Sequence, residues 1–286
     1  NASLMALLWN SIATKKTGLL YKSLTEVPAK PKECTWINYI RCHDDIGLGY
    51  DDSFIQEMGW DPKQHRKFLL DYYCQRLEWS PAKGLLFMYN PKTGDGRITG
   101  SAASLLGLES ALESGDKDLL EKAISKINLL HGIILSFGGI PMIYAGDEIA
   151  TLNDYSYTAD SSKSGDSRWV NRPRQDWAMV KKLKNGDLPQ SKVYQTLKHL
   201  ISVRKANPVL ADTNNLILHQ SGNDHMLVFE RTQGTKEGII VICNFDETPQ
   251  VMDSGWLMKL GYFTKGNPKD LVANKKIDVK SRLLEL

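Results

Sequence analysis

The sequence predicts an α/β domain followed by an all-β domain. Two short, apolar, β-prone segments in the first two thirds of the chain are separated by helical patterns, which is typical of α/β architecture. After Pro208 the pattern changes to short strands divided by turn residues, which is typical of antiparallel β domains. We therefore expect one domain over residues 1–206 and a C-terminal antiparallel β-sandwich over residues 207–286.

The first of the two apolar segments, residues 36–40, leads directly into the polar run 41–47. The second, residues 138–144, ends at Gly146, Asp147 and Glu148. A complete (β/α)8 barrel of ~250 residues needs eight strands, and residues 1–206 offer only these two as buried strands. The sequence therefore predicts part of a (β/α)8 barrel.

The segments between these strands also have recognisable patterns. Residues 48–100 alternate aromatic and charged residues with turn signals, which predicts a long loop region with short helices. Residues 101–137 are helical in pattern, with a break near residues 114–116, and residues 190–206 predict a further helix.

The first residues favour a helix with one buried face, because apolar residues recur at roughly helical spacing. They are Leu4, Leu7, Leu8, Ile12 and Leu19. No obvious N-cap precedes them. No basic segment lies before them and no small-residue cleavage site follows, so we expect no secretory signal and a chain that begins inside a helix.

Composition excludes several protein classes. Of the 286 residues, 42% are hydrophobic and 24% are charged, which is ordinary for a globular protein. The mean hydropathy of −0.34 predicts no membrane partner. The formal net charge is +3 and the basic residues are scattered, so we expect no nucleic-acid partner.

Cysteine and histidine spacing argues against a metal. Cys34, Cys42, Cys74 and Cys243 lie too far apart for a zinc ribbon or a CxxC pair, and the histidines show no metal-ligand spacing. We therefore expect reduced thiols in a cytoplasmic protein, with no metal and no cofactor. No P-loop, HExxH motif or Ser/His/Asp order is present either.

Polar residues after the first strand are candidates for catalysis. His43, Asp44 and Asp45 lie at the carboxyl end of a predicted parallel strand, where barrel enzymes keep their chemistry. An imidazole can hydrogen-bond sugar hydroxyls, and a carboxylate can stabilise an oxocarbenium-like transition state. The alternative is that Asp44 or Asp45 caps the following turn. Asp147 and Glu148 are either an acid and base pair or, as we expect, cap or loop residues.

Arginines in loop contexts are candidates for gripping a polyhydroxylated ligand, although each has the alternative of being a surface charge. They are Arg66, Arg97, Arg168, Arg172 and Arg174. The aromatic residues of segment 48–100 have two interpretations as well, a sugar-stacking surface or the core of that region.

Five segments carry a resemblance to a known family: residues 4–11 (LMALLWNS), 38–47 (NYIRCHDDIG), 89–95 (YNPKTGD), 146–154 (GDEIATLND) and 166–169 (DSRW). Together, and in this order, they resemble amylosucrases, which belong to the α-amylase superfamily (glycoside hydrolase family thirteen). The similarity runs from the first residues to the β-rich end. The HDDIG and GDExxTLND patterns are specific within that superfamily.

The resemblance implies a place for each segment in the family's fold. The first helix resembles barrel helix six, residues 37–42 strand seven, residues 45–100 the inserted loop subdomain and residues 140–144 strand eight. In that family, an Asp nucleophile after strand four and a Glu acid/base after strand five act on sucrose with retention and extend an α-glucan. Both strands would precede residue 1, so we expect the 286-residue chain alone to be inactive.

The same resemblance implies roles for single residues. Asp44 matches the carboxylate that stabilises the transition state, and His43 matches its neighbour that contacts the glucosyl ring. Asp45 and Arg168 match residues that shape the sucrose pocket, Arg168 through an ion pair with an Asp upstream of this sequence. Arg66 and Arg97 match contacts on the acceptor side.

The sequence therefore predicts the C-terminal part of a sucrose-using α-transglucosylase. Its expected partners are sucrose or an α-glucan in the intact enzyme and the missing N-terminal half of the barrel. Self-association is also expected, because a two-strand piece of a barrel leaves strand edges and apolar faces uncovered. The alternatives are a sucrose hydrolase or other α-glucosidase of the same superfamily, and a non-catalytic carbohydrate-binding or vestigial fragment.

Overall fold

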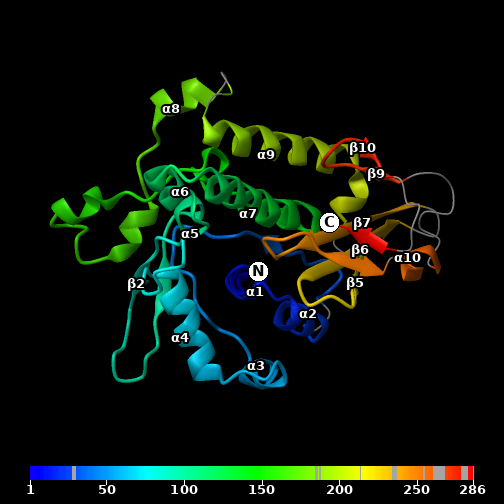
Figure 1. Cartoon of the computed structure of the whole chain (residues 1–286), viewed down its shortest axis with the longest axis horizontal. Helices are drawn as coiled ribbons and strands as arrows, with labels where there is room; N and C mark the ends of the chain where they lie inside the picture. Colours follow the sequence, from blue (N-terminus) through cyan, green and yellow to red (C-terminus); the bar gives the residue numbers. More distant parts are fainter. Residues whose placement is uncertain are drawn as a thin grey trace.

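The computed structural model describes residues 1–27, 30–183, 186, 188–212, 214–233, 237–253, 255–259, 268–277 and 283–285. A helical part with short strands leads into a part rich in antiparallel strands (Figure 1). The helices are α1 (Ala2–Thr14), α2 (Gly18–Thr25), α3 (Asp52–Glu57), α4 (Pro62–Tyr73), α5 (Ala102–Leu105), α6 (Leu108–Ser114), α7 (Lys117–Ser136), α8 (Trp177–Lys182), α9 (Pro189–Ala206) and α10 (Gly255–Lys259). The 3₁₀ helices include η1 (Asp147–Ile149), η2 (Tyr155–Ala159), η3 (Ser167–Asn171) and η5 (Pro208–Leu210).

The strands form small separate sheets. They are β1 (Ile37–Asn38), β2 (Leu85–Phe87), β3 (Arg97–Thr99), β4 (Ile140–Pro141), β5 (Leu216–His219), β6 (Met226–Gln233), β7 (Glu237–Asn244), β8 (Val251–Asp253), β9 (Lys269–Asp270), β10 (Lys275–Lys276) and β11 (Leu283–Glu285). Among the described residues, β1 pairs with β4, β2 with β3, β8 with β11 and β9 with β10, while β5, β6 and β7 form one sheet in that order.

The N-terminal helix is α1, and it lies inside the core. Leu4 and Leu8 are fully buried, and the Trp9 indole donates a 2.6 Å hydrogen bond to the Ile40 carbonyl, which ties α1 to the chain just after β1. Two expectations are corrected here. Asn1 caps α1, because its side-chain oxygen accepts from the Leu4 amide at 3.1 Å. The helix also ends at Lys15, whose φ of 57° is left-handed, and α2 follows separately.

The central pairing is the parallel one between β1 and β4. Ile37 lies opposite Ile140, and the Ile140 amide donates to the Trp36 carbonyl at 2.9 Å. Gly139 makes this approach possible, because its φ is +70° and a Cβ there would lie 2.4 Å from the Trp36 carbonyl oxygen. Both strands are shorter than predicted.

The expectation that these strands are buried is also wrong in part. Ile37 and Ile140 are 48% and 53% exposed. Within the described residues each strand pairs only with the other. The Asn1 amine donates to the Ile37 carbonyl and Arg204 donates to the Gly139 carbonyl, both at 2.7 Å, so the exposed part of the pair is the side chains of Ile37 and Ile140.

The region between β1 and α5 contains α3, α4 and the antiparallel hairpin β2–β3. Short helices were predicted there, but the hairpin was not. Ile46 forms a bridge to Ile98 of β3, which brings the hairpin against the chain that follows β1. The helical stretch expected over 101–137 is divided into α5, α6 and α7, with left-handed glycines at Gly107 and Gly115 before and after α6.

The β-rich part follows α9, which matches the predicted helix within one residue. The strands expected near residues 216–220, 226–231, 238–245 and 249–252 correspond to β5, β6, β7 and β8. Phe229 of β6 meets Phe137 edge to face at 5.5 Å, so this sheet shares the main apolar core with α1 and α7. Of the expected β-sandwich, residues 213, 234–236, 254, 260–267, 278–282 and 286 lie outside the described residues.

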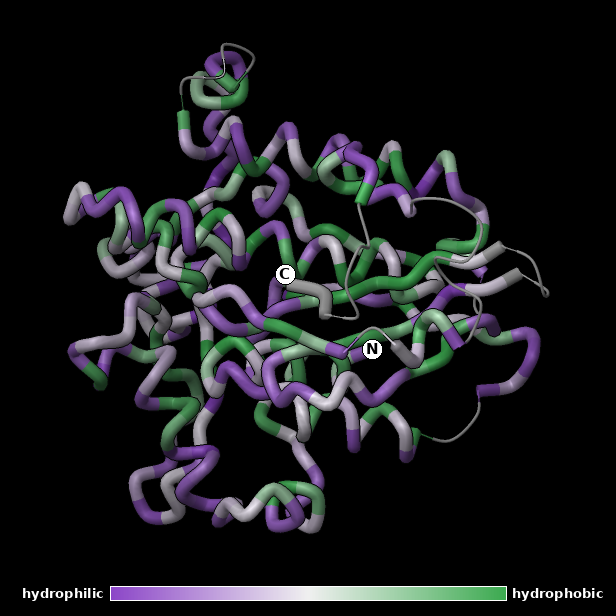
Figure 2. The backbone as a smooth tube through the Cα atoms, turned by 45° about the vertical axis from the view of Figure 1, so that its right-hand side comes forward, coloured by the Kyte–Doolittle hydropathy of each residue, from purple (hydrophilic) through white to green (hydrophobic). Residues whose placement is uncertain are grey.

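Hydrophobic residues gather along the central strands and the helix faces that meet them, as Figure 2 shows. Met226 and Val228 of β6 also pack with Met252 and Leu257 in a second, smaller apolar cluster. No helix in the described part of the chain is long and apolar enough to cross a membrane.

The exposed face of β1 and β4 leads to a first prediction. We expect the purified chain to self-associate as its concentration rises, because the half-exposed side chains of Ile37 and Ile140 favour association. Ile140→Lys should lower the weight-average mass in sedimentation velocity. Ile217→Lys, at a 45% exposed residue on β5, is the matched control and should change it little. A monomer of 32.2 kDa for the parent chain across a wide concentration range would contradict this expectation.

Candidate active site

The site begins at the carboxyl ends of β1 and β4. Because the two strands run parallel, the residues that follow each of them emerge at the same edge. Cys42–Asp45 follow β1, and Tyr144–Asp147 follow β4. Two polar segments about a hundred residues apart in sequence therefore meet.

Asp44 forms an ion pair that leaves it accessible. Its Oδ1 accepts a 2.6 Å hydrogen bond from Arg168 Nη1, and its side chain remains 45% exposed. Arg168 also binds Asp166 with two arms, Nε to Oδ1 at 3.0 Å and Nη2 to Oδ2 at 2.9 Å. The guanidinium lies over the Phe87 ring, 4.4 Å from its centroid. Sequence reasoning expected an upstream Asp as the partner of Arg168, whereas here Asp44 and Asp166 bind it.

These contacts determine the protonation of Asp44. The hydrogen bond from Arg168 lowers the pKa of Asp44 to about 2, against the opposing effect of burial. Arg168 also lowers the pKa of Asp166. Asp44 is therefore a fixed negative charge at neutral pH. Such a group stabilises a cation and cannot serve as a proton donor there.

Asp45 points to a different partner. Its side chain is only 4% exposed, and its Oδ2 accepts a 3.0 Å hydrogen bond from Arg97 Nη1. Arg97 opens β3 and is 54% exposed. The pair therefore anchors the β2–β3 hairpin to the end of β1 and keeps one guanidinium at the surface.

Arg66 on α4 organises the chain beyond Asp45. Its Nε donates to the Leu48 carbonyl at 3.1 Å, and its Nη2 donates to the Tyr50 carbonyl at 2.8 Å and to Asp52 at 2.5 Å. Much of its donor capacity is used within the protein. Its immediate role is to hold the segment around residues 48–52 against α4.

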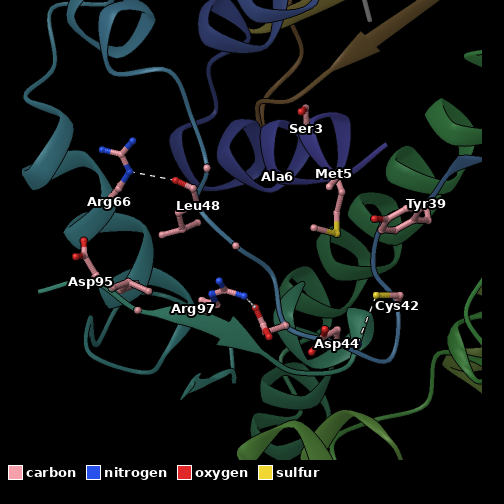
Figure 3. Close-up of a pocket in the computed structure, with 16 residues that line it drawn as sticks. Ser3, Met5, Ala6, Tyr39, Cys42, Asp44, Leu48, Arg66, Asp95 and Arg97 are labelled. Carbon is pink, nitrogen blue, oxygen red and sulfur yellow. Dashed lines mark hydrogen bonds and ion pairs between the residues drawn. The ribbon is translucent and has the colours of Figure 1, made fainter. Parts of the chain in front are cut away.

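A cavity of about 510 Å³ collects most of the expected residues (Figure 3). Asp44, Asp45, Arg66 and Arg97 line it, together with Ala2, Ser3, Met5, Ala6, Tyr39, Cys42, Gly47, Leu48, Gly49, Leu70, Asp95 and Gly96. Arg168 reaches this cavity only through Asp44. The His43 side chain is exposed and is not part of the lining, and the His43 carbonyl accepts a 2.7 Å hydrogen bond from Arg172.

Sequence reasoning missed a buried ion pair beneath this site. Arg41 Nε donates to Asp147 Oδ1 at 2.8 Å, and both side chains are at most 2% exposed. Asp147 was expected to cap a helix or end a loop, so that expectation is wrong. Burial raises the pKa of Asp147, while Arg41 opposes the shift. Glu148 does act locally, because its Oε2 accepts from the Gly146 amide at 2.7 Å.

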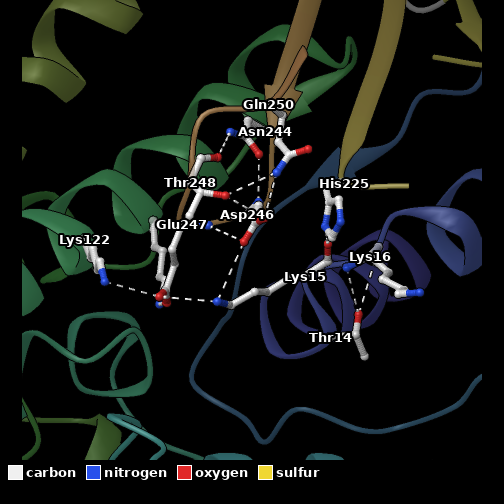
Figure 4. Close-up of polar contacts among 11 residues, drawn as sticks. Thr14, Lys15, Lys16, Lys122, His225, Asn244, Asp246, Glu247, Thr248 and Gln250 are labelled. Carbon is white, nitrogen blue, oxygen red and sulfur yellow. Dashed lines mark hydrogen bonds and ion pairs between the residues drawn. The ribbon is translucent and has the colours of Figure 1, made fainter. Parts of the chain in front are cut away.

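A second polar cluster joins the helical part to the β-rich part (Figure 4). Glu247 lies 2.7 Å from Lys126, 3.3 Å from Lys15 and 3.5 Å from Lys122. Burial alone would raise the pKa of Glu247, but Lys126 and Lys15 lower it to about 2. His225 Nδ1 forms a 2.6 Å hydrogen bond with the Lys15 carbonyl at the end of α1. These contacts hold the β7–β8 connection against α1 and α7.

In the described part of the chain, no group of three or more His, Cys, Asp or Glu side chains is placed to hold a metal ion.

No family model matches the chain. Glucosylglycerate phosphorylase of Escherichia coli (strain K12) is 25% identical over 187 residues, which are 64% of this chain and 30% of that protein. The crystal structure of sucrose 6F-phosphate phosphorylase from Thermoanaerobacter thermosaccharolyticum matches with a TM-score of 0.59 at 16% identity, over 88% of this chain and 44% of that one.

The structural match shows a shared fold, and the sequence match shows a relationship to glucosylglycerate phosphorylase over part of this chain. The chain spans less than half the length of both proteins.

The ion pair between Asp44 and Arg168 yields a second prediction. Arg168→Met should raise the pKa of Asp44 from about 2 toward its ordinary 3.8, because it removes the hydrogen bond that favours the carboxylate. Carboxyl ¹³C NMR titration of labelled aspartate, assigned with Asp44→Asn, measures this change. Arg174→Met, an exposed arginine six residues further along the chain, is the control and should leave the pKa of Asp44 unaltered.

The lowered pKa of Asp44 also determines how the ion pair changes the free energy of unfolding with pH. Because the folded pKa of Asp44 lies below the unfolded value, the pair stabilises the fold fully above pH 3.8 and loses that effect as pH falls through about 2. Asp44 is 45% exposed, so the effect is at most about 1 kcal/mol. An Asp44 pKa that stays near 2 in Arg168→Met would contradict this account.

Proposed function

We propose that the chain is the C-terminal portion of an enzyme of the α-amylase superfamily that transfers an α-glucosyl group from sucrose with retention. In this proposal Asp44 stabilises the transition state. One observation carries it: Asp44 is half-exposed beside a cavity at the carboxyl end of β1, and Arg168 holds it ionised.

The charge arrangement suits this role. Glycosyl transfer develops positive charge at the anomeric carbon, and a carboxylate fixed nearby binds that charge more strongly in the transition state than in the ground state. Arg168 alone would cancel the charge of Asp44. Asp166 offsets Arg168, so the three groups together keep one net negative charge facing the substrate.

The remaining groups belong to a segment outside this chain. Retaining transfer needs a nucleophile and an acid/base about 5 Å apart on either side of the bond that breaks, and Asp44 supplies neither function. We propose that an upstream segment provides an Asp and a Glu for these steps. His43 then contacts the glucosyl ring, Asp45 and Arg168 shape the pocket, and Arg66 and Arg97 face the acceptor.

A second candidate is phosphorolysis. Two proteins that resemble this chain are named phosphorylases, and Arg66 and Arg97 both line the cavity. A guanidinium has five donors, and Arg97 commits one arm to Asp45, so it has capacity for an anionic acceptor. We favour a glucan acceptor on the motif resemblance, and phosphate is the alternative.

The third prediction concerns the native product that contains this chain. Asp44→Asn should lower kcat for sucrose by about 10²-fold or more while changing KM far less, because the charge acts mainly in the transition state. Asp118→Asn, on the exposed start of α7, is the control and should leave both values unchanged. A loss confined to KM would overturn the assigned role.

The same assay tests the chain by itself. The 286-residue chain should release no fructose from sucrose above a protein-free blank. Turnover by the purified chain that survives Asp44→Asn would refute the proposal.

The fourth prediction separates the two acceptors. With the native product, sucrose alone should yield an α-glucan, and added phosphate should leave the rate of fructose release almost unchanged. If phosphate instead accelerates release, yields glucose 1-phosphate and loses that effect in Arg97→Met, the phosphorylase candidate replaces the glucan-forming one. Release of glucose and fructose in equal amounts, with no glucan and no glucose 1-phosphate, would indicate a hydrolase.

A further inference from the structure

We infer that Arg41 is a positioning residue. It fixes the geometry of the ion pair between Asp44 and Arg168, because it binds the backbone beside Asp44 and the backbone beside Arg168. The functional importance of this positioning rests on the proposed function of Asp44. The contacts and the test below do not depend on turnover.

The Arg41 guanidinium contacts four residues. Arg41 Nε binds Asp147 Oδ1 at 2.8 Å, and Nη1 donates to the carbonyls of Cys42 and Asn171, both at 3.3 Å. The guanidinium carbon lies 4.6 Å from the centre of the Tyr144 ring. Arg41 thereby joins the chain after β1, the chain after β4 and the end of η3.

The two carbonyls are the informative partners. Cys42 lies two residues before Asp44, and Asn171 lies three residues after Arg168. A displacement of Arg41 therefore alters the backbone on both sides of the ion pair. The Asp44 amide also donates to Cys42 Sγ at 3.4 Å, so the chain bends tightly between Cys42 and Asp44.

Burial argues for a role in geometry. Replacing a buried ion pair by apolar groups is often neutral or stabilising, so stability alone gives a weak reason for Arg41 and Asp147 to lie in the core. A planar guanidinium can donate in several fixed directions at once, which the ammonium of a lysine cannot. That property is what binding two carbonyls and one carboxylate requires.

The charged groups that surround Asp44 itself are Arg168, Asp166, Asp45 and Arg97. A substitution at Arg41 leaves all of them in the chain. Arg41→Met also removes the positive charge of Arg41, which by itself would raise the pKa of Asp44. The charge-conserving Arg41→Lys is therefore the variant in which a shift in the titration of Asp44 reports a change in position.

The experiment measures the pKa of Asp44 by carboxyl ¹³C NMR in the purified chain, together with the melting temperature. In Arg41→Met, the pKa of Asp44 should rise from about 2 toward 3.8 as Arg168 loses its fixed approach. Arg231→Met is the matched control, since Arg231 is also fully buried and donates to the Asp212 carbonyl in the β-rich part. It should lower the melting temperature and leave the pKa of Asp44 near 2.

Two conservative variants keep the test decisive if Arg41→Met does not fold. Asp147→Asn keeps the volume and weakens the hold on Arg41, and it should raise the pKa of Asp44 in the same direction. Arg41→Lys keeps the positive charge but lacks the planar guanidinium, and it should give the same rise in the pKa of Asp44. An Asp44 pKa that stays near 2 in the folded variants would overturn the inference, because Arg41 would then be a structural residue only.

This outcome is separable from that of the proposed function. A native product that does not act on sucrose would leave the titration result intact. Conversely, an unchanged pKa of Asp44 in the Arg41 variants would refute the positioning role of Arg41 without affecting the kinetic test of Asp44.

Discussion

The parallel pairing of β1 with β4 assembles the site from distant parts of the chain. Its backbone hydrogen bonds join segments about a hundred residues apart, as the 2.8 Å bond from the Met142 amide to the Asn38 carbonyl illustrates. Parallel strands end at one edge, so the polar residues after each strand must lie close together. Short strands suffice for this purpose because α1 and the hairpin β2–β3 hold the chain on either side of Asp44.

Exposure distinguishes the carboxylates that gather at this edge. Asp147 and Asp45 are 1% and 4% exposed and bind Arg41 and Arg97, so each serves the fold. Asp44 is paired as well, yet 45% of its side chain remains open. An ionised carboxylate that is oriented by one arginine and still reachable can act on a ligand, whereas its buried neighbours cannot. Of these three aspartates, Asp45 and Asp147 therefore form structural ion pairs, and Asp44 is the candidate for catalysis.

Much of this fold could be predicted from local patterns. The helix after residue 189, the strands near Met226 and Gly238, and the polar ends of two apolar segments all follow from periodicity and turn residues. The ion pair between Arg41 and Asp147 could not be predicted, because each residue alone resembles a loop charge and only the strand pairing brings them together. The pairing of Arg168 with Asp44 could not be predicted either, because the two residues lie 124 positions apart. The expected ion pair of Arg168 with an Asp upstream of this sequence stays a prediction.

The central claim is that Asp44 acts together with groups outside this chain. The most direct test is the mass of the native product, detected in its source cells with an antibody against residues 210–286. The account predicts a product clearly heavier than 32.2 kDa, with room for the segment that carries the nucleophile and the acid/base. A product of 32.2 kDa only would contradict it, and a carbohydrate-binding or vestigial role would then replace the catalytic one.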